Sequence, residues 1–554
     1  MLDIEPGNCR FPIDLYGLLL KNRYNECIRP EMQRIESEVS VMKLNYKRTI
    51  LVGFAFFLIS AFWQAYDATI PVILTNKFGM SQGWSGVIMA LDNILAVFML
   101  PIFGAISDKC NTKYGKRTPF ITIGTIIAAV AILGLSFVDN AQLRNISDVS
   151  KLDDPASLSV IYDTQANSEL QTPEGERFVL VDTYSKDEFV QIKSTADNNE
   201  TNPDYTNYVV PARQAYAAEQ TKANPVPLIV FVVLLLVVLV AMATFRSPAV
   251  ALMPDVTVKP LRSKANAIIN LMGTAGGILV LVLGIVFATS AVKNQLMSYN
   301  TYYGVIAGLM IVSLVIFLLT VREVRWSEQM RSDSIKYGIQ EQDEDSDEEK
   351  RKLSRKEKAS LILILASIAL WYFGYNAVTS KYSVYAGNIL NMDYNTTLLL
   401  AQAAAIVAYL PAGMIASKIG RKKTILAGVV LLSTAFGAAS FLRAGSSVMV
   451  MNILFAMAGI GWATINVNSF PMVVEMCSGG DIGKYTGFYY TASMSAQIVT
   501  PMLSGLLMDK MGMTVLFPYA AIFAAFAFVT MFFVKHGDAK PAAKQGLEAL
   551  DIDD

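Results

Sequence analysis

Long apolar runs separated by short polar segments dominate this chain. A helix needs about 20 apolar residues to cross the ~30 Å hydrocarbon core of a bilayer. Membrane-spanning strands would be about 10 residues long and would alternate apolar with polar positions, whereas these runs are longer and apolar on all sides. We therefore predict helical spans at 49–70, 84–107, 119–138, 226–250, 266–290, 301–321, 359–378, 393–417, 424–442, 447–470, 486–508 and 514–534.

Composition supports a membrane protein. Hydrophobic residues make up 53% of the chain and charged residues only 17%. Soluble domains usually have about 25% charged residues. We expect an all-α membrane protein in which twelve spans form two pseudo-symmetric six-helix bundles.

A short basic loop occurs once in each half of the chain. The first joins two predicted spans and runs from Gly104 through Asp108 and Lys109 to Arg117. The second runs from Gly413 through Ser417 and Lys418 to Gly420-Arg421-Lys422-Lys423. A glycine, a polar residue four positions later and a basic cluster at the same place in both halves indicate a duplicated protein.

The basic residues also predict the orientation of the spans. Lys and Arg concentrate before the first span and in the loops 108–118, 251–265 and 418–423, all of which lie on one side if there are twelve spans. Cytoplasmic loops carry the excess of basic residues. We therefore expect a multi-pass protein of the plasma membrane with both termini in the cytoplasm.

Several segments fall outside the bilayer. Residues 1–41 contain no apolar stretch long enough for a signal peptide, and we interpret them as a dispensable tail or a product of start-site choice. The organisation that follows is 42–138 (three spans), 139–224 (external insertion), 225–321 (three spans), 322–358 (cytoplasmic linker), 359–535 (six spans) and 536–554 (tail).

The insertion 139–224 is acidic. It carries seven Lys or Arg and fifteen Asp or Glu, which gives a net charge of −8. Its stretch 178–184 has the composition of a strand, so a small folded cap and a disordered loop are both open interpretations.

Cysteine and histidine content excludes several kinds of chemistry. Cys9, Cys27, Cys110 and Cys477 show no paired metal-ligand spacing, and the single histidine is His536 in the C-terminal tail. A phosphate-cradling glycine loop is also missing from the sequence. We expect no enzyme activity, no metal or other cofactor and no nucleic-acid partner.

Charges inside predicted spans are the strongest functional signal, because placing one in lipid costs at least ~2.5–3.5 kcal/mol. Asp92 lies eight residues into the second span, and Asp67 lies in the outer third of the first. Arg246 precedes Asp255 by nine residues, which places it about 13 Å deeper along a helix. We predict that Asp92 first, and Asp67 second, carry a coupling proton next to Arg246.

Amides and aromatic rings near these charges predict a substrate cavity. These residue types suit a neutral hydroxyl-rich molecule, because amides bind hydroxyl groups and aromatic faces cover the apolar side of a sugar ring. Each residue alone is equally consistent with helix packing. The candidates for substrate binding are Trp63, Gln64, Tyr66, Asn93, Arg246, Trp371, Tyr375, Asn376, Gln402, Trp462, Asn466, Asn468 and Gln497.

A second repeat, at an offset of 220 residues, predicts gate residues at the cytoplasmic mouth. It aligns Asp255 with Glu475 and Lys264 with Lys484, so each carboxylate has a lysine nine residues later as a plausible partner. Solvated interfacial charges are the alternative, and they contribute little. With the basic loops, the predicted gate set is Asp108, Lys109, Gly115, Lys116, Arg117, Asp255, Lys264, Arg421, Glu475 and Lys484.

These motifs resemble those of the major facilitator superfamily. The loop ending Gly115-Lys-Arg-Thr-Pro-Phe is similar to that of glycoside–pentoside–hexuronide symporters and of sucrose/proton symporters, and the segment from Arg246 to Asp255 resembles the arginine element of the sucrose carriers. The resemblance covers 42–138 and 226–535. It implies a central site, alternating access and cation-coupled sugar uptake, with a sugar and a cation as partners. We expect a monomer.

Two departures limit the resemblance. The paired aspartates of melibiose-type carriers fall at Ala96 and Leu100 here, so we favour H⁺ over Na⁺ as the coupling ion. Ser417 replaces the aspartate of the second loop, which predicts unequal gates. An exporter or antiporter of drugs or metabolites is the alternative transporter, and a non-transporting sugar sensor that uses the insertion 139–224 is the alternative from another class.

Overall fold

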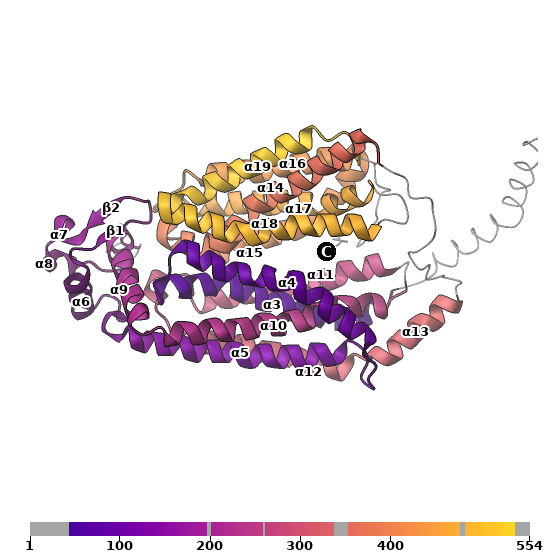
Figure 1. Cartoon of the computed structure of the whole chain (residues 1–554), viewed down its shortest axis with the longest axis horizontal. Coiled ribbons are helices and arrows are strands. Elements are labelled where there is room, and N and C mark those ends of the chain that lie inside the picture. Colours follow the sequence, from indigo (N-terminus) through magenta and orange to yellow (C-terminus); the bar gives the residue numbers. More distant parts are fainter. Residues whose placement is uncertain (1–43, 197–200, 259–260, 337–352, 477–481, 538–554) are drawn as a thin grey trace, which may run out of the picture.

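A computed structural model describes residues 44–196, 201–258, 261–336, 353–476 and 482–537 of the chain (Figure 1). The predicted tail 1–41, most of the tail 536–554 and Cys9, Cys27 and Cys477 lie outside these residues.

Two bundles of long helices make up most of the described chain (Figure 1). The first half contains α3 (Tyr46–Asn76), α4 (Gln82–Lys109), α5 (Thr118–Asn145), α10 (Val226–Asp255), α11 (Arg262–Val286) and α12 (Asn300–Thr320). The second half contains α14 (Arg355–Tyr385), α15 (Tyr394–Ile419), α16 (Arg421–Ala439), α17 (Val448–Val474), α18 (Ile482–Met511) and α19 (Leu516–Phe532). The predicted all-α fold of two six-helix bundles is confirmed.

Within the described residues, ten helices are long and apolar enough to cross a membrane. The two bundle helices outside that set are α15 and α18, both of which were predicted as spans. Both pack against neighbours in the second bundle and contact the first.

Several helices extend beyond the predicted spans. α5 continues to Asn145 rather than ending at 138, α10 continues to Asp255, and α14 runs from Arg355 to Tyr385. The apolar run defines the part of a helix that lipid can surround, whereas caps and packing define where the helix ends. At the start of α14, for example, Ser354 and Glu357 form a capping box.

The two halves use the same helix pairings. In the first half, α3 packs on α11 and α12, α10 packs on α4 and α5, and α5 packs on α12. The corresponding pairs of the second half are also in contact: α14 with α18 and α19, α17 with α15 and α16, and α16 with α19. Between the halves, α4 contacts α18, α11 contacts α15, and α3 contacts α14. This correspondence is the structural expression of the duplication predicted from the loops.

The insertion folds into a small cap with its own core. It contains α6 (Pro155–Gln165), strands β1 (Glu169–Gln171) and β2 (Arg177–Val179), α7 (Leu180–Thr183), α8 (Lys186–Phe189), the single π turn η3 (Tyr205–Val209) and α9 (Val210–Ala223). Leu158, Leu180, Phe189 and Tyr205 are among its buried core residues. The structure thus favours the folded cap over the disordered loop.

The strand predicted at 178–184 is mostly wrong. β2 ends at Val179, and α7 follows it from Leu180 to Thr183. β2 pairs antiparallel with β1, with Leu170 opposite Phe178. Leu180, the first residue of α7, is fully buried in the cap core.

The linker begins with a helix. α13 (Glu323–Lys336) follows α12 at the end of the molecule opposite the cap (Figure 1). We call this the linker end and the end that carries the cap the insertion end. Glu323 is buried. The prediction of a solvated connector over 322–358 therefore misses a buried contact at its start.

Candidate functional site

Three charged side chains meet between helices of the first half. Asp67 on α3 and Asp92 on α4 are partly buried and lie within electrostatic range of each other. The guanidinium of Arg246 on α10 lies within electrostatic range of Asp92. The Nδ2 of Asn93 donates a hydrogen bond to Asp92 over 2.8 Å. The structure brings together the three charges that the sequence singled out, and we call them the central cluster.

A pair of glutamines joins the two halves beside this cluster. The Nε2 of Gln402 on α15 donates to the Oε1 of Gln64 on α3 over 2.5 Å. Gly277 on α11 leaves room for the pair, because a Cβ atom there would lie 3.3 Å from the Oε1 of Gln402. Two residues predicted to bind substrate thus form a contact between the bundles.

Aromatic rings flank the cluster from both halves. Tyr375 on α14 lies within electrostatic range of Asp67 and stacks on Trp462 of α17, with ring centroids 3.7 Å apart and planes 3° apart. On α3, Trp63 and Tyr66 meet edge to face at 5.4 Å. Flat ring faces of this kind cover the apolar side of a ligand ring.

Four buried polar atoms near the cluster have no hydrogen-bond partner within the described structure. They are Trp63 Nε1, Tyr66 OH, Asn376 Nδ2 and Gln402 Oε1. Leaving a buried donor or acceptor unsatisfied costs about 1–3 kcal/mol. A hydroxylated ligand supplies both donors and acceptors, so these atoms suit a polar ligand better than an apolar one.

Some predicted substrate residues lie elsewhere. Trp371 is 1% exposed in the core of the second half. Asn468 is buried, and its amide donates to the carbonyl oxygen of Thr464 one turn earlier on α17 over 2.9 Å. Asn466 and Gln497 are half-buried on α17 and α18. For Trp371 and Asn468 the structure supports a packing role.

At the linker end, Arg117 holds two helices of the first half together. Its Nε donates to Asp255 over 2.7 Å, its Nη2 to Asp108 over 2.5 Å, and its Nη1 to the hydroxyl of Ser107 over 2.5 Å. Burial alone would lower the pKa of Arg117, but its bonds to Asp255 and Asp108 outweigh burial and raise that pKa. The arginine therefore stays charged while it clamps α4 to α10.

Glu323 completes this network from the linker. Its carboxylate accepts the backbone N–H groups of Lys116, Arg117 and Thr118 at 2.5, 2.9 and 2.8 Å. Gly115 precedes them with φ +117°, and a Cβ atom there would lie 2.2 Å from the carboxylate carbon of Glu323. A glycine is required because of both its φ and this close approach. Sequence reasoning missed Glu323, which looked like one of many linker charges.

The second half has a corresponding but smaller arrangement. Arg421 follows Gly420, whose φ is +95°, and its Nη1 lies 2.5 Å from the Oε1 of Glu475. The side chain of Ser417 lies outside the described residues. In both halves, an arginine of the neighbouring loop thus binds the repeated carboxylate. Lys264 and Lys484, which were predicted as partners, are half-buried and exposed, and Lys109 is exposed.

At the insertion end, hydrogen bonds cross between the two halves. Asp509 at the end of α18 accepts the N–H groups of Gln82 and Gly83, the first residues of α4, over 2.7 and 2.8 Å. Lys381 of α14 is fully buried, and its Nζ donates to the carbonyl oxygen of Gln82 over 2.6 Å. A carboxylate at a helix N-terminus also interacts favourably with the helix dipole.

The cap adds contacts to the opposite half. The N–H of Met513 donates to the carbonyl oxygen of Pro173, in the turn between β1 and β2, over 2.7 Å. Glu174 in the same turn lies 3.5 Å from Arg443. Gly512 has φ +88°, and a Cβ atom there would lie 2.4 Å from the carbonyl oxygen of Glu174. The cap belongs to the first half in sequence and contacts it, and these bonds dock it on the second half as well.

Sequence reasoning did not find the residues of this closure. Asp509 and Lys381 fall just beyond the predicted ends of their spans, at 508 and 378, so they looked like solvated end charges. A buried ion pair was also missed: the Nζ of Lys77 lies 2.6 Å from Asp139, and both side chains are fully buried. The available signal was an ionisable residue within about two turns of an apolar run.

Family models match much of the chain. A model described as Major Facilitator Superfamily matches residues 216–409 and 394–551, and one described as MFS/sugar transport protein matches 51–142. Together they cover well over half of the sequence.

Curated relatives match short segments. The sucrose transport protein SUC4 of Arabidopsis thaliana is 27% identical over 105 residues, which is 19% of this chain and 19% of that protein. The proton-associated sugar transporter A of Rattus norvegicus is 30% identical over 112 residues, 20% of this chain and 14% of that protein. The match therefore spans about a fifth or less of each relative.

Solved structures match nearly the whole chain in fold. The inward-open xylose transporter XylE of E. coli covers 91% of this chain and 99% of its own, with 14% identity and a TM-score of 0.53. A bacterial homologue of the iron transporter ferroportin, in an inward-facing state, covers 88% and 99%, with 11% identity and a TM-score of 0.54. Proteins that carry such different substrates match this chain with similar TM-scores, so the fold does not identify a substrate.

Proposed function

Because the chain belongs to the Major Facilitator Superfamily, we propose that it is a secondary active transporter that takes up a sugar together with a proton. The proposal rests first on the central cluster, in which Asp67, Asp92 and Arg246 come from three helices of one half. Charged side chains inside membrane-spanning helices are costly, and in membrane proteins they mark ion and substrate pathways.

The surroundings of the cluster support a sugar as the substrate. The cluster is surrounded by unpartnered polar atoms from α3, α14 and α15. Stacked aromatic rings from α14 and α17 also lie around it. The names of the relatives agree, since they include sucrose transport proteins and a proton-associated sugar transporter. A hydroxyl-rich ring would satisfy the polar atoms at its edge and cover the aromatic faces.

The arrangement of the halves supports transport by alternating access. Among the described residues, hydrogen bonds cross between the halves at the insertion end and between Gln64 and Gln402, while Arg117 binds Asp255 and Arg421 binds Glu475 within one half. Figure 1 shows α4 and α18 close together near the insertion end and further apart toward the linker end. We assign the linker end to the cytoplasm, because the predicted basic loops lie there.

In the proposed cycle, Asp92 takes a proton from the outside and the sugar then binds Arg246 and the neighbouring amides. Neutralising Asp92 weakens its attraction to Arg246 and frees the guanidinium for sugar hydroxyls. The closed, transitable state is favoured only when proton and sugar are both bound, which couples the two flows.

The test is uptake into proteoliposomes under an imposed proton gradient, with a panel of labelled mono- and disaccharides. We expect accumulation of at least one sugar above its equilibrium level in the native protein. Asp92→Asn should still exchange sugar but not accumulate it, because a permanently neutral amide carries no proton across. Arg246→Ala should lose both activities.

The matched control is Asp182→Asn, which removes an exposed carboxylate from the cap. It should accumulate sugar like the native protein. Accumulation by Asp92→Asn at the native level, or uptake that does not respond to the gradient, would exclude proton coupling through this cluster.

A further inference from the structure

One face of α3 is accessible and ends at Asp67. Trp63 and Gln64 precede Asp67 by four and three residues, so the three side chains lie on the same side of the helix. All three are half-buried, whereas every other residue from 65 to 78 is buried. Gln64 accepts a hydrogen bond from Gln402 of the second half, so this face points toward the second half.

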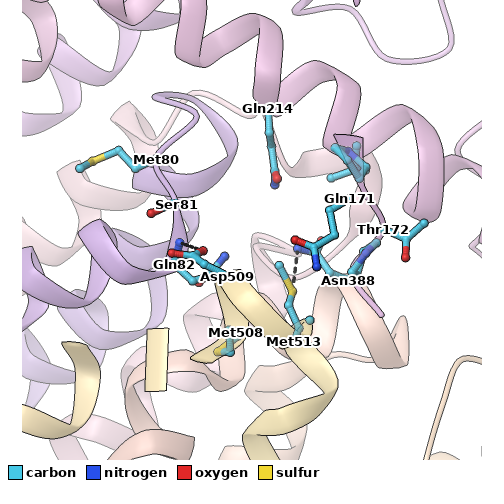
Figure 2. Close-up of a pocket in the computed structure, with 14 residues that line it drawn as sticks. Met80, Ser81, Gln82, Gln171, Thr172, Gln214, Asn388, Met508, Asp509 and Met513 are labelled. Atoms are coloured by element: carbon cyan, nitrogen blue, oxygen red, sulfur yellow. Dashed lines mark hydrogen bonds between the residues drawn. The ribbon is translucent and has the colours of Figure 1, made fainter. Parts of the chain in front are cut away.

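This face stops short of the insertion end. The end of α3 at Asn76 lies nine residues, or about 13 Å, beyond Asp67. Met80, Ser81 and Gln82 come after it and line a separate cavity of about 140 Å³ (Figure 2). The residues of the central cluster do not line that cavity, so the surface that Asp67 reaches lies between the halves, beside the cluster.

The carboxyl group of Asp67 lacks the partners that Asp92 has. Asp92 accepts a hydrogen bond from Asn93 and lies within electrostatic range of Arg246. Among the described residues, Asp67 makes no hydrogen bond, and the charged group within electrostatic range of it is Asp92, another carboxylate. Its oxygens are also not among the buried polar atoms that lack a partner in the described structure, so they are accessible and can meet a ligand.

Charge balance favours a proton on Asp67. Two carboxylates at one site rarely ionise together, because each disfavours the charge of the other. Arg246 and Asn93 stabilise the negative charge on Asp92. An ionised Asp67 would instead lie in a spanning helix with no described cation in range, at a cost of at least ~2.5–3.5 kcal/mol. With Asp92 ionised, Arg246 charged and Asp67 protonated, the central cluster is neutral as a whole.

A protonated carboxyl group suits a sugar hydroxyl. It has one O–H donor and one carbonyl acceptor, so it can donate to a hydroxyl oxygen and accept a hydroxyl proton. Proteins hold a carboxylic acid neutral in an apolar site so that it can donate a hydrogen bond to a ligand. Tyr375 of the second half lies within electrostatic range of Asp67 and stacks on Trp462, so a sugar ring whose edge reaches Asp67 also meets an aromatic ring.

We propose that Asp67 is a protonated carboxyl group that binds a hydroxyl group of the sugar and carries no proton across the membrane. The inference rests on the proposed function, since it assigns a role within the same site. It changes the role of Asp67 from the second proton carrier predicted from the sequence to a residue that sets specificity for the substrate. Of the two carboxyl groups, only Asp92 then changes its charge during the cycle.

Infrared difference spectroscopy of the full chain in lipid nanodiscs at neutral pH tests the proton. The spectrum of the native protein minus that of Asp67→Asn should contain the C=O band of a protonated carboxyl group. Asp182→Asn, which removes an exposed carboxylate from the cap, should instead give the bands of an ionised carboxylate. Carboxylate bands in the difference for Asp67→Asn would overturn the proposal.

Uptake into proteoliposomes tests the sugar contact, with the sugar that the native protein accumulates best and with its monodeoxy analogues. Asp67→Leu should raise the KM for the sugar about tenfold, as expected for one buried hydrogen bond, and should leave the number of protons carried per sugar at the native value. One analogue should have a KM about tenfold above that of the parent sugar in the native protein, but the same KM as the parent in Asp67→Leu. Equal losses in both proteins for every analogue would overturn the contact.

Asp67→Asn keeps a donor and an acceptor but has no acidic proton, so it covers the case in which Asp67→Leu does not fold. It should raise KM less than Asp67→Leu and keep the native ratio of protons to sugar, whereas Asp92→Asn should lose accumulation. Native accumulation that Asp67→Asn abolishes in the same way as Asp92→Asn would overturn this inference alone. A native protein that accumulates no sugar would overturn the proposed function, and the sugar contact with it.

Discussion

The charged residues at the two ends of the molecule differ in whether their bonds join residues of one half or of both halves. At the linker end, Arg117 binds Asp108 and Asp255 of its own half, and Arg421 binds Glu475 of its own half. At the insertion end, Asp509 and Lys381 of the second half bind the start of α4 in the first. Bonds within a half move with it as a rigid body, whereas bonds across the halves must break before that end opens. Substitutions at the two ends should therefore have different kinds of effect.

Of the substitutions that test this comparison, Asp509→Ala should have the largest effect, which is to open the insertion end. It leaves the N–H groups of Gln82 and Gly83 without acceptors and removes the carboxylate near Lys381. Hydrogen bonds to charged groups contribute about 1.5–3 kcal/mol, so the closed insertion end should lose roughly 3 kcal/mol. Spin labels at Val226 and Met449, exposed at that end in opposite halves, should report longer distances in a cysteine-free background.

Asp509→Asn is the matched variant, because it keeps one acceptor oxygen and removes the charge. It should shift the distance distribution about half as far. If Asp509→Ala leaves the distribution unchanged, these bonds do not hold the end closed.

The sequence predicts the two bundles but not the partners of the charged residues at the two ends. Hydrophobic runs and the repeated loops predicted the two bundles, because spanning length and basic loops are local properties. The ion pair between Arg117 and Asp255 was not predictable, because the two residues are far apart in sequence and meet only after α5 and α10 pack. Asp509 was missed for the same reason: its partners are 426 and 427 residues away in the chain.

Gly512→Ala should separate the cap from the second half. The substitution forces an L side chain to adopt φ +88° and brings its Cβ to 2.4 Å from the carbonyl oxygen of Glu174. A left-handed conformation costs about 1–3 kcal/mol in a residue other than glycine, and undocking the turn relieves the clash. Hydrogen exchange at 169–179 should accelerate roughly tenfold or more.

Gly445→Ala is the control for backbone strain alone. Gly445 has φ +81°, but a Cβ atom there would meet nothing within 4 Å. It should leave exchange in the cap at the native rate. Equal acceleration in both variants would show that strain, and not the contact with Glu174, releases the cap.

Glu323→Ala tests the linker end, where the expected effect is on stability and not on opening. It removes the acceptor of three N–H groups at the start of α5. Loss of an N-terminal cap costs about 0.5–2 kcal/mol, so the melting temperature should fall while the Val226–Met449 distance stays the same. Glu328→Ala, exposed on the same helix α13, should change neither, and a longer distance in Glu323→Ala would contradict the rigid-body picture.

The central cluster shows which site residues a sequence can identify. Asp67, Asp92 and Arg246 were predictable because charge in an apolar run is costly wherever the helices pack. The sequence did not distinguish Trp371 from Tyr375. In the structure, Trp371 is buried in the core of the second bundle, whereas Tyr375 stacks on Trp462. Which face of a span points inward depends on packing against several neighbours, and a span that is apolar on all sides does not encode it.

Glu174→Gln should have the smallest effect, although its contact also crosses between the halves. Glu174 and Arg443 are 3.5 Å apart, and their side chains are 49% and 41% exposed. Exposed ion pairs contribute about 0–1 kcal/mol and are screened by salt, whereas the bond from Met513 to Pro173 uses the backbone and survives the substitution. Hydrogen exchange at 169–179 should change less than about threefold and lose its dependence on salt. A change as large as that of Gly512→Ala would mean that the ion pair, rather than the backbone contact, docks the cap.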